Sequence, residues 1–233
     1  MRRKALRAAL PLTIPVLMGY LFLGIAFGVL LSRIGYHVGW AFLMSVFIYA
    51  GAMQFVVIEL LASPFGLFNA LLLTLTVNAR HLFYGFSLLE KFSISGKLKP
   101  YMIFSLTDET YSLLCVAESP QGVNRKWFRF FIAALNHLYW VLGSLLGNVA
   151  GTLLDFDYTG IEFAMTALFI VIFIEQWEST KKHLPALLGL GLSLLCLLLF
   201  GSENFVIFSM IAIFFSLAIL YRRNSRVERE AEP

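Results

Sequence analysis

The chain has 233 residues, of which 59% are hydrophobic and 14% are charged, whereas ordinary soluble domains carry roughly 25% charged residues. Several apolar runs approach or exceed the ~20 residues that a helix needs to cross a bilayer. These numbers exclude a soluble globular domain and predict an all-α, polytopic membrane helix bundle. They also argue against a β-barrel, whose apolar segments are short and alternating. The net charge of +4 lies in connectors and tails, which points to membrane orientation and not to nucleic acid.

The first membrane helix is predicted at residues 11–31. A basic amphipathic stretch, MRRKALRAAL, precedes it, and the apolar run is too long for the core of a cleaved signal peptide. Two prolines and three glycines punctuate the run. The one-turn spacing of the glycines favours close packing against another helix. The alternative is a kink that opens backbone groups to a substrate path. These residues are Pro11, Pro15, Gly19, Gly24 and Gly28.

A second apolar run covers residues 40–62 and contains the motif YAGAMQF, residues 49–55. Gly51 and Gln54 lie near its middle. An interrupted helix at this point would present backbone amides to an anion. The alternative is that Gly51 makes one small-residue contact and that Gln54 makes one hydrogen bond between helices.

The third run, residues 65–89, carries NARHLFYG. At about 100° per residue, Asn78 and His81 share one helix face, while Arg80 and Tyr84 share another. An ionisable group in hydrocarbon costs roughly 2.5–3.5 kcal/mol, so such groups are site candidates. Polar groups on two faces imply that the helix is surrounded by protein or broken near Asn78. The alternative for Arg80 is a side chain that extends to the membrane interface.

The fourth run follows a connector at residues 90–100 and carries SLTDETYS, residues 105–112. The most unusual feature of this apolar run is a pair of adjacent carboxylates, Asp108 and Glu109. Tyr111 is expected beside Asp108. Buried carboxylates of this kind usually face a polar cavity. The alternative is a short helix that lies in the membrane interface.

Four further membrane segments are predicted at residues 127–154, 160–174, 184–200 and 205–221, which brings the total to about 7–8. Asn136 and His137 are interpreted as packed polar residues. The connectors alternate in charge, and the positive-inside rule then places both termini in the cytoplasm. The connector residues are Arg125, Lys126 and Arg129, then Asp155 and Asp157, then Lys181 and Lys182, then Glu203, then Arg222, Arg223, Arg226 and Arg229.

Residues 40–118 follow the positive-inside rule less well, since four full crossings would place Lys91, Lys97 and Lys99 outside. Broken or re-entrant segments would relieve this conflict, because irregular backbone is allowed at depth where it lines a cavity.

The sequence also contains a weak internal repeat. Residues 28–45 resemble residues 151–166, and residues 103–114 resemble residues 207–218. Repeats of this kind are common in secondary transporters. We therefore expect one transmembrane domain built from two parallel four-segment repeats. The first repeat, residues 1–118, holds the candidate site; the second covers residues 119–222, and residues 223–233 form a cytoplasmic tail.

Four stretches, in this order and spacing, resemble the AzlC family: LPLTIPVLMGYLFLGIAFGVL, YAGAMQF, NARHLFYG and LTDETYSL. The resemblance covers essentially the whole chain. Members of that family are the large subunits of bacterial branched-chain amino-acid exporters. The resemblance implies export of valine, leucine and isoleucine, with methionine as a further candidate. It also implies a bacterial cytoplasmic (inner) membrane location and a small hydrophobic AzlD-like partner subunit.

A free amino acid carries one ammonium and one carboxylate, and a transporter must replace the water around both. We expect Asp108 or Glu109 to bind the ammonium and Arg80 to bind the carboxylate in a bidentate manner. Asn78, Gln54 and amides near Gly51 would assist, and Phe83, Tyr84 and Tyr111 would bound the side-chain pocket. No Walker A motif or glycine-rich phosphate loop is present, so a gradient must drive transport. His81 is the expected proton-coupling group.

Other functions stay open at this stage. Arg80 and the acidic pair would form a structural salt-bridge network in a channel, or in a carrier for another small zwitterion. An enzyme is disfavoured because no HExxH or GxSxG signature is present. Cys115 and Cys196 lie in apolar runs without metal-ligand spacing, so neither a disulfide framework, a metal nor a cofactor is expected.

Overall fold

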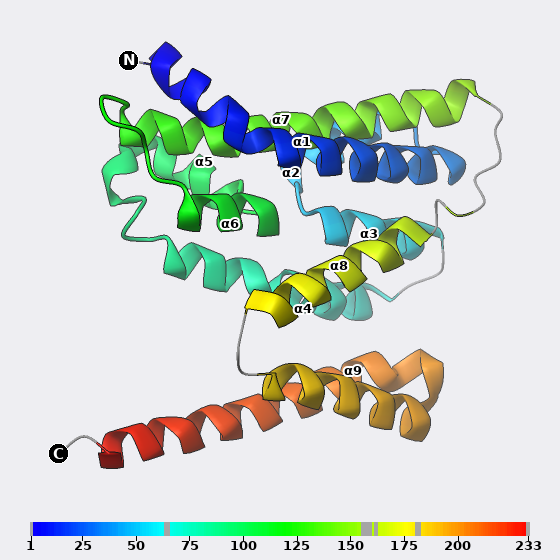
Figure 1. Cartoon of the computed structure of the whole chain (residues 1–233). Helices are drawn as coiled ribbons and strands as arrows, with labels where there is room; N and C mark the ends of the chain where they lie inside the picture. Colours follow the sequence, from blue (N-terminus) through cyan, green and yellow to red (C-terminus); the bar gives the residue numbers. More distant parts are fainter. Residues whose placement is uncertain (1, 63–65, 155–159, 161–162, 180–182, 232–233) are drawn as a thin grey trace. The chain divides into compact units, whose positions relative to one another are not determined.

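The computed structural model describes residues 2–62, 66–154, 160, 163–179 and 183–231 (Figure 1). Regular structure in these ranges is entirely helical, which confirms the all-α prediction. The helices are α1 (Arg2–Arg33), α2 (Val38–Phe47), α3 (Gly51–Ala62), α4 (Leu67–Ser87), the 3-10 helix η1 (Ser93–Leu98), α5 (Lys99–Phe104), α6 (Asp108–Val116), α7 (Arg125–Leu153), α8 (Phe163–Ser179) and α9 (Leu184–Ala231). The chain divides into two compact units, Met1–Leu168 and Phe169–Pro233.

Helices α1 and α7 form the centre of the first unit. They run in the same direction, because Thr13 meets Tyr139 and Gly28 meets Asn148 further along both helices. A Cβ atom on Gly24 would lie 3.0 Å from the Cα of Gly143. The close packing expected from the glycine spacing is therefore confirmed at Gly24 and Gly28.

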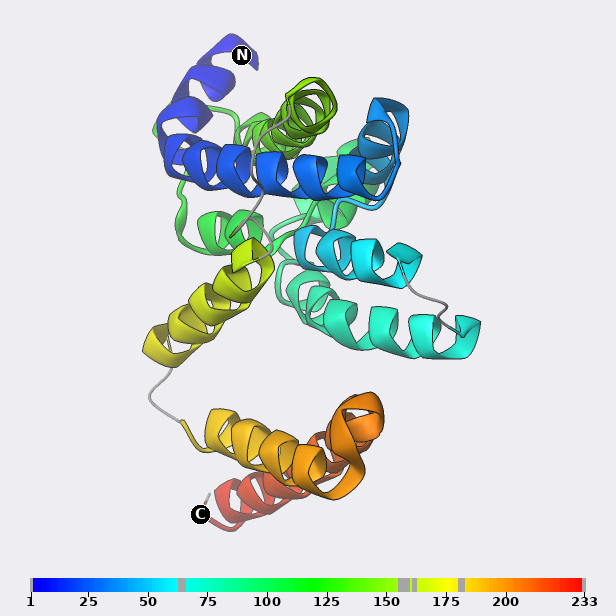
Figure 2. The same cartoon turned by 90° about the vertical axis from the view of Figure 1, so that its right-hand side faces the viewer.

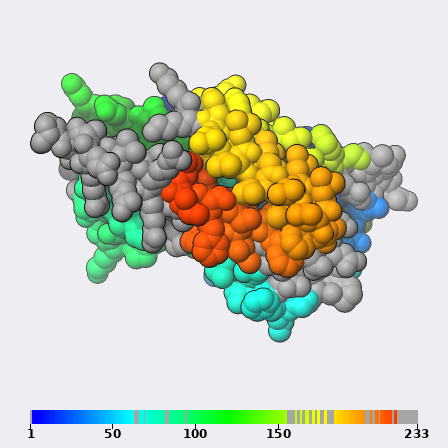
Figure 3. Space-filling view, turned by 90° about the horizontal axis from the view of Figure 1, so that it is seen from below, coloured from blue at the N-terminus to red at the C-terminus, as the bar shows by residue number. Residues whose placement is uncertain are grey.

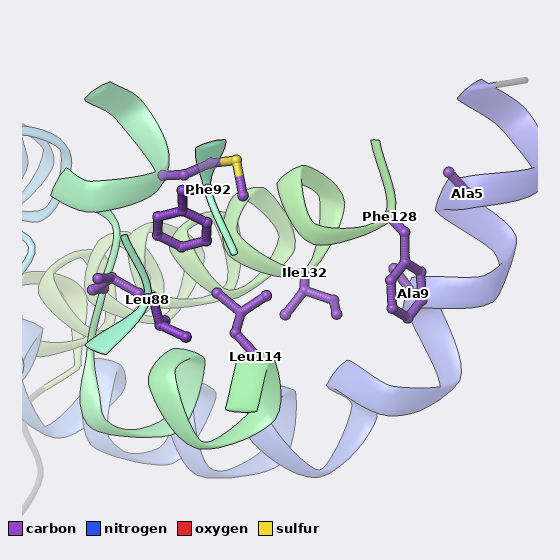
Figure 4. Close-up of a cluster of buried hydrophobic side chains, with 9 residues drawn as sticks. Ala5, Ala9, Leu88, Phe92, Leu114, Phe128 and Ile132 are labelled. Carbon is purple, nitrogen blue, oxygen red and sulfur yellow. The ribbon is translucent and has the colours of Figure 1, made fainter. Parts of the chain in front are cut away.

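Helix α1 begins at Arg2, nine residues before the predicted start at residue 11. The basic stretch belongs to this helix because its small residues pack inside the protein. Ala5 and Ala9 join Leu88, Phe92, Leu114, Phe128 and Ile132 in a buried cluster (Figure 4). The guanidinium of Arg2 also lies 4.1 Å from the centre of the Trp127 ring, a cation–π contact that anchors the helix start.

The predicted run at residues 40–62 is two helices, α2 and α3, with a break at residues 48–50 (Figure 2). Tyr49, in the break, has a φ angle of 44°, a conformation that is uncommon for any residue except glycine. Its ring stacks on His137 of α7, with the ring centroids 4.1 Å apart. The interrupted-helix interpretation of YAGAMQF is therefore confirmed.

The run that carries SLTDETYS is also divided, because α5 ends at Phe104 and α6 begins at Asp108. Thr107 caps α6 by accepting a hydrogen bond from the amide of Thr110 at 3.2 Å. The broken segments expected within residues 40–118 are therefore confirmed here as well. By contrast, α4 is continuous through Asn78, which excludes the alternative of a break at that position.

Three helices in the described part of the chain are long and apolar enough to cross a membrane: Arg2–Arg33, Arg125–Leu153 and Leu184–Gly201. The last is the first arm of α9, which turns at Gly201 with a φ angle of 71°. Phe200 stacks on Phe208 across this turn. Leucines such as Leu194 and Leu198 of that arm are exposed, on the helix drawn in gold to orange in Figure 3. An apolar exposed surface of this kind fits a lipid environment.

Several residues of the charge pattern lie outside the described residues. These are Asp155, Asp157, Lys181 and Lys182. The side chains of Phe83, Glu203 and the C-terminal arginines are likewise outside the described part.

Candidate functional site

The site is centred on an ion pair between α4 and the start of α6. Arg80 Nη1 lies 3.0 Å from Asp108 Oδ2, and the two side chains are 24% and 18% exposed. Tyr84, one turn after Arg80, donates its hydroxyl hydrogen to Asp108 Oδ1. The helix face predicted for Arg80 and Tyr84 thus brings both side chains to one carboxylate. Asp108 lies in the first turn of α6, where the helix dipole also favours a negative charge.

Aromatic rings lie beside this ion pair. Tyr84 and Tyr111 stack with ring centroids 4.4 Å apart and an interplanar angle of 15°. His81 meets the edge of Tyr84 at 5.8 Å. Tyr111 is held by a hydrogen bond from its hydroxyl to Ser87 at 3.2 Å. The structure therefore joins Arg80, His81, Tyr84, Asp108 and Tyr111 in one cluster.

Two polar atoms on α4 are left open in this region. Asn78 Oδ1 and Arg80 Nε are buried and make no hydrogen bond to any described residue. An unpaired buried polar atom lowers the stability of the folded state, so such atoms are rare in native structures. Arg80 Nε belongs to the ion pair itself, and an unpaired charged donor there is suited to a polar ligand.

Glu109 has different surroundings from Asp108. Its carboxylate accepts a hydrogen bond of 2.6 Å from the hydroxyl of Tyr20 on α1. Among the described residues it has no ion-pair partner. The adjacent carboxylates thus divide into one that is paired with a cation and one that is bound only by a neutral donor.

Gln54 and Gly51 are brought to α7. Gln54 is fully buried, donates to Ser45 Oγ at 3.3 Å and accepts from Trp140 Nε1 at 2.8 Å. Gly51 faces the same indole, since a Cβ atom there would lie 3.1 Å from the Trp140 ring. No described contact joins Gln54 to Arg80 or Asp108. The environment matches the interhelical hydrogen bond expected as the alternative for this residue.

Asn136 and His137 are both buried and hydrogen-bonded, which confirms their interpretation as packed polar residues. The sequence did not indicate the polar cluster that forms around His137. His137 Nδ1 lies 3.1 Å from the Tyr101 hydroxyl, and Nε2 lies 3.1 Å from the carbonyl oxygen of Ser45. Tyr49 and Phe104, at the two helix breaks, also contact the His137 ring. The two breaks therefore meet on α7. Their adjacency has no local sequence signal, although a break in each run was detectable.

The chain was compared with known proteins. The family model described as AzlC protein matches residues 15–154. The chain is 48% identical, over 96% of its length and 88% of the relative, to the branched-chain amino acid transport protein AzlC of Bacillus subtilis. It is 42% identical to an uncharacterized membrane protein of Haemophilus influenzae, over 98% of this chain and 93% of that protein.

A more distant relative is the inner membrane protein YgaZ of Escherichia coli, at 29% identity over 73% of this chain and 72% of that protein. No solved structure matches the chain.

Proposed function

Because the chain belongs to the AzlC family, we propose that it is a secondary active exporter of the branched-chain amino acids valine, leucine and isoleucine, and of methionine. It is a membrane protein and a homologue of a branched-chain amino acid transport protein. The activity is transport and not enzymatic catalysis. The observation that carries the proposal is the partly exposed Arg80–Asp108 pair beside stacked aromatic rings.

An ion pair can bind a zwitterion by exchanging partners. The substrate carboxylate replaces Asp108 at the guanidinium of Arg80, and the substrate ammonium takes the freed Asp108 carboxylate. Each charge keeps a partner of opposite sign, so the exchange avoids leaving an unpaired charge in a low-dielectric site. The open Nε of Arg80 adds a second donor for a bidentate contact. Glu109, one residue further along α6, adds a negative field that favours the ammonium.

The side chain of the substrate is proposed to lie against Tyr84 and Tyr111. Their stacked rings give a flat apolar wall next to the charges. A single methyl group changes binding in such a pocket by only ~1–3 kcal/mol. Valine, leucine and isoleucine are therefore expected to compete with one another. Asn78, with its open oxygen, is proposed to accept a second hydrogen bond from the ammonium. Gln54 and Gly51 remain proposed assistants on the α2–α3 side.

The energy is proposed to come from an ion or proton gradient, with His81 as a coupling group. His81 is adjacent to Arg80 in the chain and contacts Tyr84. A histidine changes charge between about pH 5 and 8. The charge of His81, and with it the charge of the cluster, is therefore proposed to follow the pH on the side of the membrane to which His81 is open.

The wider architecture is also part of the proposal. We propose about 7–8 membrane segments in two parallel repeats. The parallel packing of α1 and α7 supports this arrangement. The residues that meet across these helices are 126 residues apart in the chain at Thr13 and Tyr139, and 120 apart at Gly28 and Asn148. The chain is proposed to lie in the cytoplasmic membrane with both termini inside, and to work with a small AzlD-like subunit. The basic start of α1 supports this orientation.

The experiment that tests the proposal is counterflow in liposomes. The full chain, with and without a small AzlD-like partner, is reconstituted with unlabelled leucine inside, and uptake of labelled leucine and valine is followed. Trans-stimulation is expected from a carrier. Leakage without trans-stimulation would favour a channel, and a folded protein that moves neither amino acid would overturn the proposal.

A further inference from the structure

A continuous chain of hydrogen bonds connects Glu109 to α7. The Tyr20 hydroxyl lies 2.6 Å from Glu109 Oε2 and 2.6 Å from Thr107 Oγ1. Thr107 Oγ1 lies 3.0 Å from Thr110 Oγ1, which lies 3.0 Å from Asn136 Nδ2. Tyr20, Thr107, Thr110 and Asn136 are buried, while Glu109 is partly exposed. Of these five residues, only Glu109 at the carboxylate end is partly exposed rather than buried.

Each contact in the chain needs one hydrogen, and each hydroxyl carries only one. If Tyr20 donates to Glu109 while Thr107 donates to Thr110, the short contact between Tyr20 and Thr107 contains no hydrogen. All contacts are satisfied together only when the hydroxyls point the same way along the chain. Two such arrangements exist, and they differ in the charge of Glu109.

With Glu109 ionised, every donor points toward it, from the Asn136 amide through the hydroxyls to the carboxylate. With Glu109 protonated, its own hydrogen points to Tyr20 and the sense of every bond is reversed. The hydroxyl of Thr110 must then donate to an acceptor at the α7 end of the hydrogen-bond chain. Asn136 supplies one, because its Oδ1 is buried, unpartnered among the described residues and attached to the same amide carbon as Nδ2. Rotation of the amide by half a turn exchanges the two atoms.

The neighbours of Glu109 are consistent with a change of charge at this residue. Tyr20 of α1 donates its hydroxyl hydrogen to Glu109. Tyr49 lies between α2 and α3. The hydroxyl of Tyr49 is buried and makes no hydrogen bond to a described residue. His137 of α7 stacks on Tyr49. Arg80 is paired with Asp108, which lies beside Glu109 in the first turn of α6.

We propose that Glu109 binds and releases one proton in each transport cycle, and that the hydrogen-bond chain to Asn136 reverses its direction with each change. This inference rests on the proposed transport function and names its coupling ion. The proton comes from water on one side and is returned to water on the other, so only O–H bonds are formed and broken. Asp108 and Arg80 bind the substrate, Glu109 binds the proton, and His81 adjusts the pH response of the cluster.

The test uses the full chain in liposomes, with Glu109→Gln as the variant. Glutamine keeps the size and hydrogen-bonding capacity of a protonated glutamate but cannot release the proton. Wild-type protein is expected to hold a leucine concentration ratio of about tenfold for a pH difference of one unit at one proton per substrate. In Glu109→Gln this ratio is expected to fall to about one, and an infrared measurement reads the proton on Glu109 independently of leucine binding. Glu118→Gln is the matched control, because Glu118 is an exposed carboxylate in the connector after α6.

A second measurement does not depend on transport. Infrared difference spectra of the detergent-solubilised protein on acidification from about pH 8 to about pH 6, a range in which exposed carboxylates stay ionised, are expected to show the carbonyl band of a protonated carboxylic acid. This band is expected to be absent from Glu109→Gln and retained in Glu118→Gln. Tyr20→Phe, which removes the hydroxyl that contacts Glu109, is expected to shift this band. An unchanged band in Glu109→Gln, or pH-driven accumulation equal to wild type, would overturn the inference. Absence of counterflow in the wild type would instead overturn the transport function, and the infrared result would still decide the role of Glu109.

Discussion

Tyr49 stacks on His137 with ring centroids 4.1 Å apart, and this contact joins the break between α2 and α3 to α7. Phe104, the last residue of α5, meets the same imidazole at 6.0 Å. The two interrupted helical runs of the first unit therefore converge on one residue of an uninterrupted helix. Broken helices expose backbone groups that a continuous helix would satisfy internally, and they are tolerated at membrane depth only inside protein or beside a cavity. The convergence places irregular backbone next to the candidate site.

The first prediction concerns the exchange of partners at Arg80 and Asp108. Arg80→Lys keeps the charge but removes the planar donor pair, so leucine counterflow is expected to fall by about tenfold or more while the protein stays folded. Folding should change little, because a partly exposed ion pair contributes only ~0–1 kcal/mol. The measurement is counterflow together with thermal unfolding in detergent.

The matched variant is the reversed pair, Arg80→Asp with Asp108→Arg. A reversed pair that folds and does not transport would support the binding role of these charges. Full recovery of transport would show that the pair only joins α4 to α6, and the binding role would be lost.

The second prediction concerns the packing of α1 on α7. A Cβ atom on Gly28 would collide with backbone atoms of Ser144 and Asn148. Backbone atoms in a helix cannot move aside in the way that the end of a flexible side chain can. Gly28→Ala is therefore expected to lower the free energy of unfolding by about 1–3 kcal/mol. Gly19→Ala is the control, because nothing lies within 4 Å of a Cβ atom there. Equal thermal stability of the two variants would contradict the packing.

The sequence predicted much of this fold because long apolar runs and their charged connectors are local features. Helix α7 and the first arm of α9 agree with the predicted segments at residues 127–154 and 184–200 to within a few residues. The helix after Gly201 begins close to the predicted segment at residues 205–221 but continues to Ala231, ten residues beyond its predicted end. The helical periodicity of α4 also predicted that Arg80 and Tyr84 lie on one face, and both side chains contact Asp108.

The sequence interpretation was less successful where local and long-range signals compete. A broken segment was expected within residues 40–118, but its position was not, although Thr107 followed by two acidic residues is an N-cap signal. The partner of Glu109, Tyr20, lies 89 residues away. No local pattern identifies such a contact, so the different surroundings of Asp108 and Glu109 emerged only in three dimensions.

The third prediction concerns Gln54, whose amide connects α3 to Trp140. Gln54→Leu leaves the buried indole nitrogen without its acceptor, so a loss of about 1–3 kcal/mol in stability is expected. Gln54→Leu combined with Trp140→Phe removes both polar partners and is expected to recover part of this loss. Thermal unfolding of the single and double variants measures the coupling. Additive effects would show that the hydrogen bond contributes nothing to stability.

The last prediction concerns pH. His81 is adjacent to Arg80 and contacts Tyr84, so a proton on its imidazole adds a positive charge beside the guanidinium and competes with the substrate ammonium for Asp108. Leucine counterflow is therefore expected to weaken as the pH falls below about 6.5, the ordinary pKa of a histidine. His81→Gln is expected to give a flat profile over this range. His37→Asn is the control, because asparagine preserves the side-chain acceptor that caps α2. A pH profile of His81→Gln that matches the wild type would exclude His81 as a coupling group and would leave Glu109 as the proposed proton site.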